Sequence, residues 1–454
     1  MKKQAHFYLF LFIGIGCIRS LSAQNVTIPD ANFKNALMGL GIDLNQDSEI
    51  QNTEAEAVTS LNVAGNNISN LAGIEAFVNL LHLDCSNNLI TGLNFSTSPN
   101  LQHLFCNNNQ ISGLGVNTNA NLQTLSCHHN VLIGLNLSLC TSLQSLSCHH
   151  NQLAALNLNP CSNLHTLYCQ NNHLLALNIA NNPSLLTIDC ETNLLTSLNV
   201  SSCLSLDSLN CPKNDLTNLD ISTCTLLHYL DCSENNLNTL SANVCTNIEY
   251  LSCRANNITN LSIDNCSKLV NLDCGLNELS HLAPNSFPDL EQLNCESNQI
   301  AYLDANHCTK MNILVCYDNQ IAALFIKNGK THQTYFHLNP LQYICADSIE
   351  LAAIQQYATQ SGLGNTVIDD LCSIVSIATL LPEKKLHFYP NPAQNRLTIE
   401  CSKPAEIAIV TILGETLLHT YIEEKGDINI SALPKGMYLL QEKGTGKGKL
   451  WIKE

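Results

Sequence analysis

Two pairs of histidines have the spacing of a candidate transition-metal site. His128-His129 and His149-His150 lie 21 residues apart, and imidazole nitrogens are common ligands of zinc, copper and iron. If the chain repeats with that period, the pairs stack at one strand spacing and could hold an ion or support a metal-dependent activity. The alternative is a duplicated repeat that kept its His-His pair without any ligand. The sequence leaves both interpretations open.

Acidic and aromatic residues in register with this period are candidates for a ligand-binding face. A column of aspartates serves solubility more often than binding, although it would steer basic partners. Tyrosine side chains are favoured anchors at interfaces. The candidates on this face, with the histidines included, are Phe105, His128, His129, His149, His150, Tyr168, Asp189, Tyr229, Asp231, Tyr250 and Asp273.

Oxygen ligands with the spacing of a calcium loop precede this region. The segment 43–54 resembles the EF-hand loop, with Asp43, Asn45 and Asp47 at positions one, three and five, Glu49 at seven through its backbone carbonyl, and Glu54 as the bidentate ligand at twelve. Calcium takes six to eight oxygens, which this spacing can wrap around one ion. The chain departs from the family at Ser48, where glycine provides a positive-φ turn. The resemblance implies one structural calcium ion; the alternative is a solvated turn.

Cysteine marks the period that positions these residues. Of 23 cysteines, twelve recur every 21 residues, at Cys85, Cys106, Cys127, Cys148, Cys169, Cys190, Cys211, Cys232, Cys253, Cys274, Cys295 and Cys316. The surrounding pattern is L-x-x-L-x-C-x-x-N-x-L-x-x-L, and a degenerate first copy has Val63 and Asn66 in the cysteine and asparagine slots. The pattern resembles the leucine-rich repeat family, most closely its 21-residue bacterial class, over about residues 58–326.

A β-rich solenoid follows from this pattern. In L-x-C the alternating residues share one strand face, so Leu125 and Cys127 point inward while Ser126 points outward. One turn cannot bury its apolar residues alone, whereas stacked turns form a continuous core. We expect about 13 turns at roughly 4.8 Å spacing, with a buried asparagine ladder at positions such as Asn130. The mirrored half-repeat predicts extended segments rather than helices on the far side.

A second cysteine ladder occupies the mirrored half-repeat. It comprises Cys140, Cys161, Cys203, Cys224, Cys245, Cys266 and Cys308, with Asn182 and Phe287 in the same register. Exchange with residues that lack a thiol favours packing, since free cysteine is a small buried hydrophobe. Disulfides between stacked turns are the alternative, because the turn spacing lies within disulfide range. The C-x-x-C and Cys/His groupings of metal sites are absent.

The first 23 residues have the features of a signal peptide. Lys2 and Lys3 precede an apolar run at residues 7–18, and residues 21–23 (LSA) offer a small-residue cleavage site. The run is too short to span a bilayer, so the mature chain is expected to be exported without a transmembrane segment. A lipoprotein signal at Cys17 is the alternative, although the residues before it fit a lipid-attachment site poorly.

Caps must cover both ends of a stacked core. In a helical N-terminal cap at residues 24–57, we expect Asp30 to N-cap a helix through about Leu40, and Thr53 with Glu56 to form a capping box before a second helix. Residues 327–372 are expected to form a mixed C-terminal cap with a helix at about 348–359.

Two cysteines of the C-terminal cap lie outside both ladders. Cys345 and Cys372 are the cysteines of this segment. In an exported chain they are expected to form a disulfide that closes the cap.

The last part of the chain changes character. After a linker at 373–385, residues 386–454 show short alternating runs and turn signals typical of an immunoglobulin-like β-sandwich, with YPNP at 389–392 and a basic end at Lys453. This segment resembles the C-terminal sorting domain of the type IX secretion system of Bacteroidetes-like bacteria. The resemblance implies passage through that machinery to the outer-membrane surface or the medium. An unrelated small β module is the alternative.

Composition excludes several classes of function. The 454 residues carry a net charge of −17 with only 20 basic residues, which disfavours nucleic acid and anionic membranes as partners. No G-x-S-x-G, H-E-x-x-H, P-loop or dinucleotide motif occurs, so we expect no enzyme. The sequence predicts an exported binding or adhesion module for a protein or glycan ligand. A surface component without a specific ligand is the alternative.

Overall fold

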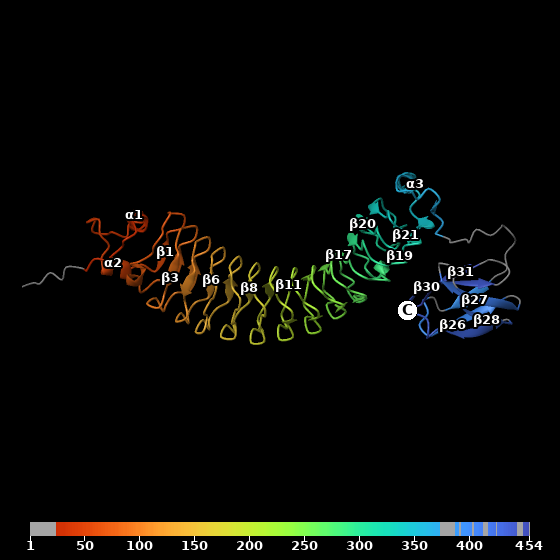
Figure 1. Cartoon of the computed structure of the whole chain (residues 1–454), viewed down its shortest axis with the longest axis horizontal. Coiled ribbons are helices and arrows are strands. Elements are labelled where there is room, and N and C mark those ends of the chain that lie inside the picture. Colours follow the sequence, from red (N-terminus) through yellow and green to blue (C-terminus); the bar gives the residue numbers. More distant parts are fainter. Residues whose placement is uncertain are drawn as a thin grey trace, which may run out of the picture.

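The structure, a computed structural model, describes residues 24–372, 386–389, 392–401, 404–411, 416–423, 425–442 and 448–453. The predicted signal peptide (1–23) and linker (373–385) therefore lie outside the described residues. Figure 1 shows a curved solenoid with helices α1 and α2 at its N-terminal end and helix α3 at its C-terminal end. A separate set of antiparallel strands follows.

One short strand from each turn builds a parallel sheet of 14 strands. Its strands are β1 (Ser60–Asn62), β2 (His82–Asp84), β4 (His103–Phe105), β6 (Thr124–Ser126), β7 (Ser145–Ser147), β8 (Thr166–Tyr168), β9 (Thr187–Asp189), β11 (Ser208–Asn210), β13 (Tyr229–Asp231), β15 (Tyr250–Ser252), β17 (Asn271–Asp273), β18 (Gln292–Asn294), β20 (Ile313–Val315) and β22 (Gln333–Tyr335). From β4 through β20 each strand pairs with residues 21 positions along the chain, so equivalent side chains of the repeats form columns on the exposed face, as between Thr124 and Ser145.

Extended segments also form the far side of the solenoid, which confirms the prediction made from the mirrored half-repeat. They are β3 (Gly92–Asn94), β5 (Gly113–Gly115), β10 (Leu198–Asn199), β12 (Leu219–Asp220), β14 (Thr239–Ser241), β16 (Asn260–Ser262), β19 (Tyr302–Asp304), β21 (Ala323–Phe325), β23 (Tyr343–Cys345) and β24 (Val367–Asp369), with 3-10 turns η1 (Ile74–Ala76) and η2 (Pro284–Ser286). Each segment is too short for a helix, because the 21-residue period leaves little chain between the two sides.

The core between the two sides consists of stacked leucines and cysteines. All nineteen cysteines of the two ladders are buried free thiols in the structure. Burial raises the pKa of these thiols, to about 12 for Cys148. In the second ladder the thiols face backbone carbonyls, as Cys140 does at 3.3 Å from the oxygen of Val116. Asn182 fills the same slot and donates to the oxygen of Cys161 at 2.7 Å, which explains how an amide can replace a thiol there.

The predicted asparagine ladder holds successive turns together. The side-chain amide of Asn130 donates to the carbonyl of Cys106 in the preceding turn at 3.1 Å and to that of Cys127 in its own turn at 3.0 Å. Its oxygen accepts from the backbone amide of Ile111 at 2.9 Å. Each ladder asparagine thus satisfies backbone groups at the bend, where the strands cannot pair with each other.

Stacking continues beyond residue 326, where the cysteine pattern ends. Strand β22 joins the main sheet and β23 joins the far side. Asn339 keeps the ladder contact, with its amide 2.9 Å from the oxygen of Cys316, but Phe336 occupies the cysteine slot and the repeat is one residue shorter. The main sheet thus has one turn more than the 13 predicted, because a pattern based on cysteine at a fixed period does not detect this turn.

The N-terminal cap contains the two predicted helices with two differences. Helix α1 (Ala31–Gly39) is N-capped by Asp30, whose carboxylate accepts from the amide of Phe33 at 2.9 Å. Leu40 lies beyond the helix and is 52% exposed, so it does not join the buried face. Helix α2 (Asn52–Glu56) starts one residue before Thr53, so the predicted Thr53–Glu56 capping box is wrong.

The capping contact of α2 comes from Glu54 instead. Its carboxylate accepts from the amide of Gln51 at 2.9 Å. The other oxygen of the Glu54 carboxylate accepts from the backbone amide of Leu44 in the calcium-like loop at 2.7 Å, a contact that Glu56 does not make.

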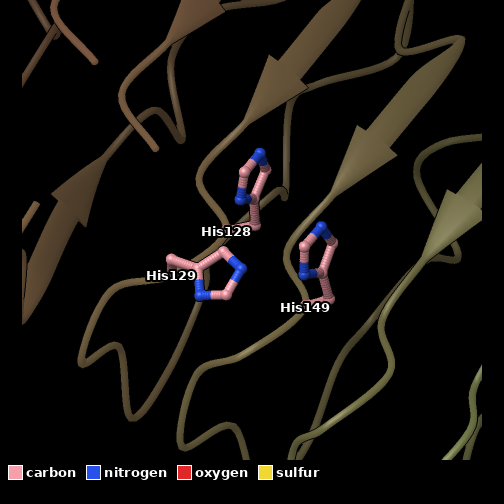
Figure 2. Close-up of side chains that lie close together, drawn as sticks. All are labelled: His128, His129 and His149. Atoms are coloured by element: carbon pink, nitrogen blue, oxygen red, sulfur yellow. The ribbon is translucent and has the colours of Figure 1, made fainter. Parts of the chain in front are cut away.

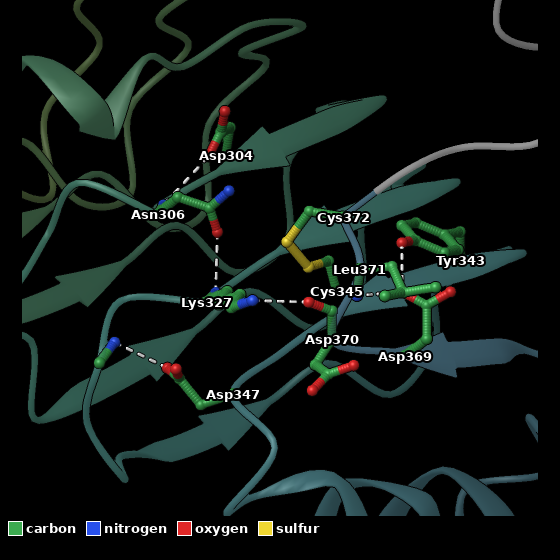
Figure 3. The surroundings of a disulfide bond; sticks show 11 residues. Asp304, Asn306, Lys327, Tyr343, Cys345, Asp347, Asp369, Asp370, Leu371 and Cys372 are labelled. Carbon is green, nitrogen blue, oxygen red and sulfur yellow. Dashed lines mark hydrogen bonds between the residues drawn. A yellow bond between two sulfur atoms is a disulfide. The ribbon is translucent and has the colours of Figure 1, made fainter.

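The C-terminal cap ends the solenoid with helix α3 (Leu351–Gln360) and a disulfide. Cys345 of β23 is bonded to Cys372, with Cα atoms 5.0 Å apart, which confirms the predicted pairing. Figure 3 shows how hydrogen bonds surround it: Tyr343 donates to the carboxylate of Asp369, and Lys327 donates to the backbone of Asp370. The last turn is therefore closed both covalently and by hydrogen bonds.

The C-terminal strands form two antiparallel sheets compatible with the predicted β-sandwich. The strands are β25 (Leu386–Tyr389), β26 (Arg396–Cys401), β27 (Ala405–Thr411), β28 (Thr416–Ile422), β29 (Lys425–Asn429), β30 (Gly436–Glu442) and β31 (Gly448–Lys453). Their orders are β25-β26-β29 and β28-β27-β30-β31. Leu397, Ile407 and Trp451 are fully buried in a core of their own.

Candidate functional site

The calcium-like loop is held in shape by its own hydrogen bonds. The carboxylate of Asp43 accepts from the amides of Asp47 at 3.2 Å and Ser48 at 2.9 Å. The backbone amide of Glu49 donates a hydrogen bond to the carboxylate of Asp47 at 2.9 Å, and this hydrogen bond lowers the pKa of Asp47. Ser48 adopts φ 66°, the left-handed conformation for which the EF-hand family uses glycine. The backbone turn that the resemblance requires is therefore present.

The oxygen ligands of this loop are not gathered around one point. Both oxygens of Glu54 accept backbone hydrogen bonds, from Leu44 at 2.7 Å and Gln51 at 2.9 Å. Within the described ranges, no three carboxylates of the loop bring ligand atoms within 4.8 Å of one another. The donor chemistry suits calcium, but the side chains of Asp47 and Glu54 would have to turn to share an ion. The side chain of Glu49, at position seven of the loop, pairs with Lys34 at 2.8 Å.

Tyr229 and Tyr250 form an aromatic pair on the exposed face of the main sheet. Their rings stack with centroids 4.5 Å apart and planes 5° from parallel. Both side chains are half-buried, and burial together with the charge of Asp231 raises the pKa of each phenol. Because β13 and β15 are adjacent, the pair is a preformed, rigid aromatic surface.

The other predicted aromatic residues stand singly on the same face. Phe105 is 38% exposed and Tyr168 is 37% exposed. The residues aligned between them are Ser126 and Ser147. The structure therefore does not join these aromatic residues into one patch with Tyr229 and Tyr250.

The predicted aspartate column occupies every second strand. Asn210 separates Asp189 from Asp231, and Ser252 separates Asp231 from Asp273. One oxygen of each aspartate accepts from a backbone amide two residues on, at 3.1, 2.9 and 3.0 Å respectively. These carboxylates thus shape the turn that follows each strand, a role that the sequence interpretation did not include.

Burial raises the pKa of Asp189 and Asp273 above the ordinary value, although hydrogen bonds from backbone amides oppose the shift. Arg254 reduces the negative charge at one end of the column. Its guanidinium lies 3.8 Å from Asp273 and also binds Glu296, two turns away. Gly275 lies between them, and a Cβ there would be 2.7 Å from the guanidinium, so glycine is needed for this bridge.

The predicted histidines do meet, in the loops after β6 and β7. The ring of His128 stacks on that of His149 with centroids 4.3 Å apart, and His129 stacks on His150 at 4.1 Å. Figure 2 shows the side chains of His128, His129 and His149 projecting toward one another.

Sequence reasoning missed a buried ionisable pair in the C-terminal cap. Nδ1 of His332 lies 3.4 Å from the carboxylate of Glu350, with the histidine side chain completely buried. Burial raises the pKa of Glu350. No periodic signal could have found this pair, because both residues lie beyond the repeat pattern.

A shallow hollow between helix α1 and the first turns is lined by Asn32, Asn35, Asn62 and Asn66 together with three apolar or glycine residues. It offers hydrogen bonds and no acid–base group. It therefore adds no catalytic candidate to the exposed face.

The C-terminal strands match a known domain over nearly their whole length. Residues 387–453 fit the family described as the secretion system C-terminal sorting domain. The C-terminal module is a sorting domain. It directs the chain to the type IX secretion machinery, so the protein is exported to the cell surface or the medium.

The solenoid is similar to leucine-rich repeat structures. The functional domain of InlJ from Listeria monocytogenes, described as including a cysteine ladder, aligns with 95% of this chain and 98% of its own, at 23% identity and TM-score 0.66. An internalin, InlF, from the same organism aligns with 78% of this chain and 100% of its own, at 20% identity and TM-score 0.59. A leucine-rich repeat protein of Leptospira interrogans aligns with 69% of this chain and 84% of its own, at 22% identity and TM-score 0.56.

These likenesses establish the leucine-rich repeat fold. No curated protein matches the sequence. Within the part of the chain that the structure describes, no helix is long and apolar enough to cross a membrane.

Proposed function

We propose that the protein is a non-catalytic recognition module, held on the outer-membrane surface or released by a Bacteroidetes-like bacterium, that binds a protein or glycan through the exposed face of its main sheet. The fold and the sorting domain make it an exported protein of a kind suited to protein interaction. Solenoid faces commonly serve binding, because exposed positions vary without altering the core.

The stacked pair of Tyr229 and Tyr250 carries this proposal. Aromatic rings held rigidly at a surface lose little conformational entropy on binding, and tyrosine is enriched among residues that dominate binding energy. The phenol groups add hydrogen-bonding capacity at the exposed edge of the pair. The rings are suited to pack against an apolar side chain or the apolar face of a sugar.

The surroundings of the pair favour a partner with basic or hydrogen-bonding groups. Asp231 lies in the column beside the tyrosines, and Asp273 follows two strands further along. The second oxygen of Asp273 accepts from the side-chain amide of Asn294 at 3.4 Å, whereas the turn hydrogen bond of Asp231 uses only its Oδ1. The other oxygen of Asp231 can therefore accept a hydrogen bond from a ligand.

A protein and glycan array probed with the intact secreted chain identifies the class of ligand. The proposal expects a ligand bound reproducibly by independent preparations. If folded protein of verified melting behaviour binds nothing reproducibly, the chain is a structural surface component instead.

A further inference from the structure

The histidine cluster lies apart from the tyrosine pair and has no part in the function proposed above. His128 and His129 follow β6, whereas His149 and His150 follow β7. Because β6 and β7 pair in register, each histidine lies beside its counterpart. The cluster therefore joins two neighbouring turns at the edge of the sheet face.

Three of the rings bring nitrogen atoms close together. One ligand nitrogen each of His128, His129 and His149 lies within 4.8 Å of the other two. Figure 2 shows a nitrogen of each ring facing the space between them. Two nitrogens bound to one tetrahedral ion at about 2.1 Å lie about 3.4 Å apart. Small side-chain rotations are therefore enough to close the rings on an ion.

One buried nitrogen atom of the cluster lacks a partner that a metal ion would supply. Nδ1 of His128 is buried and has no hydrogen-bond partner in the described structure, which is costly for a polar group. Nδ1 of His149 lies 2.8 Å from Nδ1 of His150, so one of the two must carry a proton. An ion bound between the rings would take the place of that proton and satisfy His128 as well.

Burial of three of the rings favours their neutral form. Burial, followed by repulsion from the other rings, lowers the pKa of His149 to about 4 and also lowers the pKa of His128 and His150. Neutral imidazole is the form that binds metal.

The backbone under the cluster is rigid. The amide of His129 donates to the carbonyl of His149, and the amide of His150 donates to that of Gln170, each at 3.0 Å. His129 and His150 have φ 51° and 52°, the conformation shared by the equivalent residue of each repeat. Ligands held by such a frame lose little entropy on binding.

We infer that His128, His129 and His149, with His150 within reach as a fourth ligand, bind one divalent transition-metal ion. Clustered imidazoles suit Zn²⁺, Cu²⁺, Ni²⁺ and Co²⁺ and disfavour Ca²⁺ and Mg²⁺, which prefer oxygen ligands. Three protein ligands leave a coordination position open to water or to a group on another molecule.

A second pair of stacked histidines shows what duplication of a repeat produces without a metal site. His82 and His103 stack with centroids 4.5 Å apart, as expected where a repeat duplicates a histidine. Among the described residues no third histidine, cysteine or acid brings a ligand atom to that pair. Stacking therefore does not by itself make a metal site, and the convergence of three nitrogens distinguishes the cluster.

The test titrates the metal-free intact chain, prepared without a polyhistidine tag, with Zn²⁺ and with Co²⁺. Calorimetry measures binding of either ion, and visible absorption reports the coordination of Co²⁺. His128→Asn/His149→Gln removes two ligands. Asn107 and Gln170 occupy the same column in adjacent turns, so the fold tolerates these residues. The matched control is His82→Ser/His103→Thr, which copies Ser60 and Thr124 of that column.

The inference predicts one ion per chain, nitrogen-coordinated Co²⁺ absorption, and binding weakened by at least about 100-fold in the ligand variant. The control should bind as the wild type does. Absence of binding by wild type, or equal binding by both variants, would overturn the site. Thermal melting of both variants shows whether they are folded. A separate variant, His129→Asn, which copies Asn108 and Asn171, removes a single ligand.

Discussion

At the scale of single residues, the protein is organised by how buried polar atoms find partners. The thiols pack as small hydrophobes, while ladder asparagines take the backbone groups that the bends leave unpaired. Asn214, in the middle of the solenoid, donates to the carbonyl of Cys190 in the preceding turn and to that of Cys211 in its own turn. Its side-chain oxygen accepts from the amide of Leu195 in the preceding turn at 3.0 Å. Each such residue therefore links two turns.

Replacing Asn214 by alanine should destabilise the solenoid by about 1 to 3 kcal/mol, because the buried amide of Leu195 would lose its partner. The carbonyls of Cys190 and Cys211 would each lose one of two amide donors. Denaturant unfolding measures the change, and amide exchange should accelerate most at Leu195. Asn218→Ala is the matched control, since Asn218 is exposed, and it should change stability by less than about 0.5 kcal/mol. Equal effects of the two substitutions would contradict a structural ladder.

At the scale of elements, the N-terminal cap is attached to the first turn through Asp30. One carboxylate oxygen caps helix α1 at Phe33, and the other accepts from the amide and hydroxyl of Ser69 and from the amide of Asn70. Burial alone would raise the pKa of Asp30, but these hydrogen bonds lower it to about 2. The charged carboxylate therefore stabilises the folded cap.

This shift predicts a pH dependence with a definite sign. The folded pKa lies below the ordinary value of 3.8, so the stabilisation is present above about pH 4 and is lost as the pH falls toward 2. Asparagine at this position can still cap the helix but carries no charge. The melting temperature of wild type should exceed that of Asp30→Asn at pH 5 to 7, and the difference should shrink below pH 4. A difference that stays constant with pH would contradict this role.

Calcium binding by the loop at 43–54 remains a prediction at the same scale. Chelation by EGTA should lower the melting temperature of the intact chain, and added Ca²⁺ should restore it, because an ion would offset the repulsion between Asp43 and Asp47. Asp43→Asn/Asp47→Asn keeps oxygens for the backbone hydrogen bonds and should abolish the response. His128→Asn should leave it intact. A wild-type chain insensitive to EGTA would contradict calcium binding.

At the scale of the whole molecule, the sequence predicted the repeated contacts of the solenoid more completely than contacts that occur once. Cysteines at a fixed period revealed the turns, the asparagine ladder and the stacked histidines, because in-register stacking converts period into contact. The sequence did not predict the turn around Phe336, because Phe336 occupies the position that cysteine holds in the other turns. The bridge from Arg254 to Glu296 depends on a neighbouring glycine, and the His332–Glu350 pair lies outside the repeat, so neither has a periodic signature.

The exposed face was harder to predict than the core. Leucine and cysteine positions are dictated by burial, whereas exposed columns vary freely without cost to the fold. The sequence identified Tyr229 and Tyr250 but could not show that their rings stack. It also treated the aspartates as surface charge, although each one hydrogen-bonds the turn after its strand.

The affinity of the intact secreted chain for the ligand found on the array tests the central claim, binding across the sheet face, most directly. Tyr229→Ser/Tyr250→Asn removes the stacked rings and copies the neighbouring residues Ser208 and Asn271 of the same column. The account predicts at least about a tenfold loss of affinity, with less than about a threefold loss for the control Phe105→Ser. Unchanged affinity of the double variant, with its melting temperature preserved, would contradict the account.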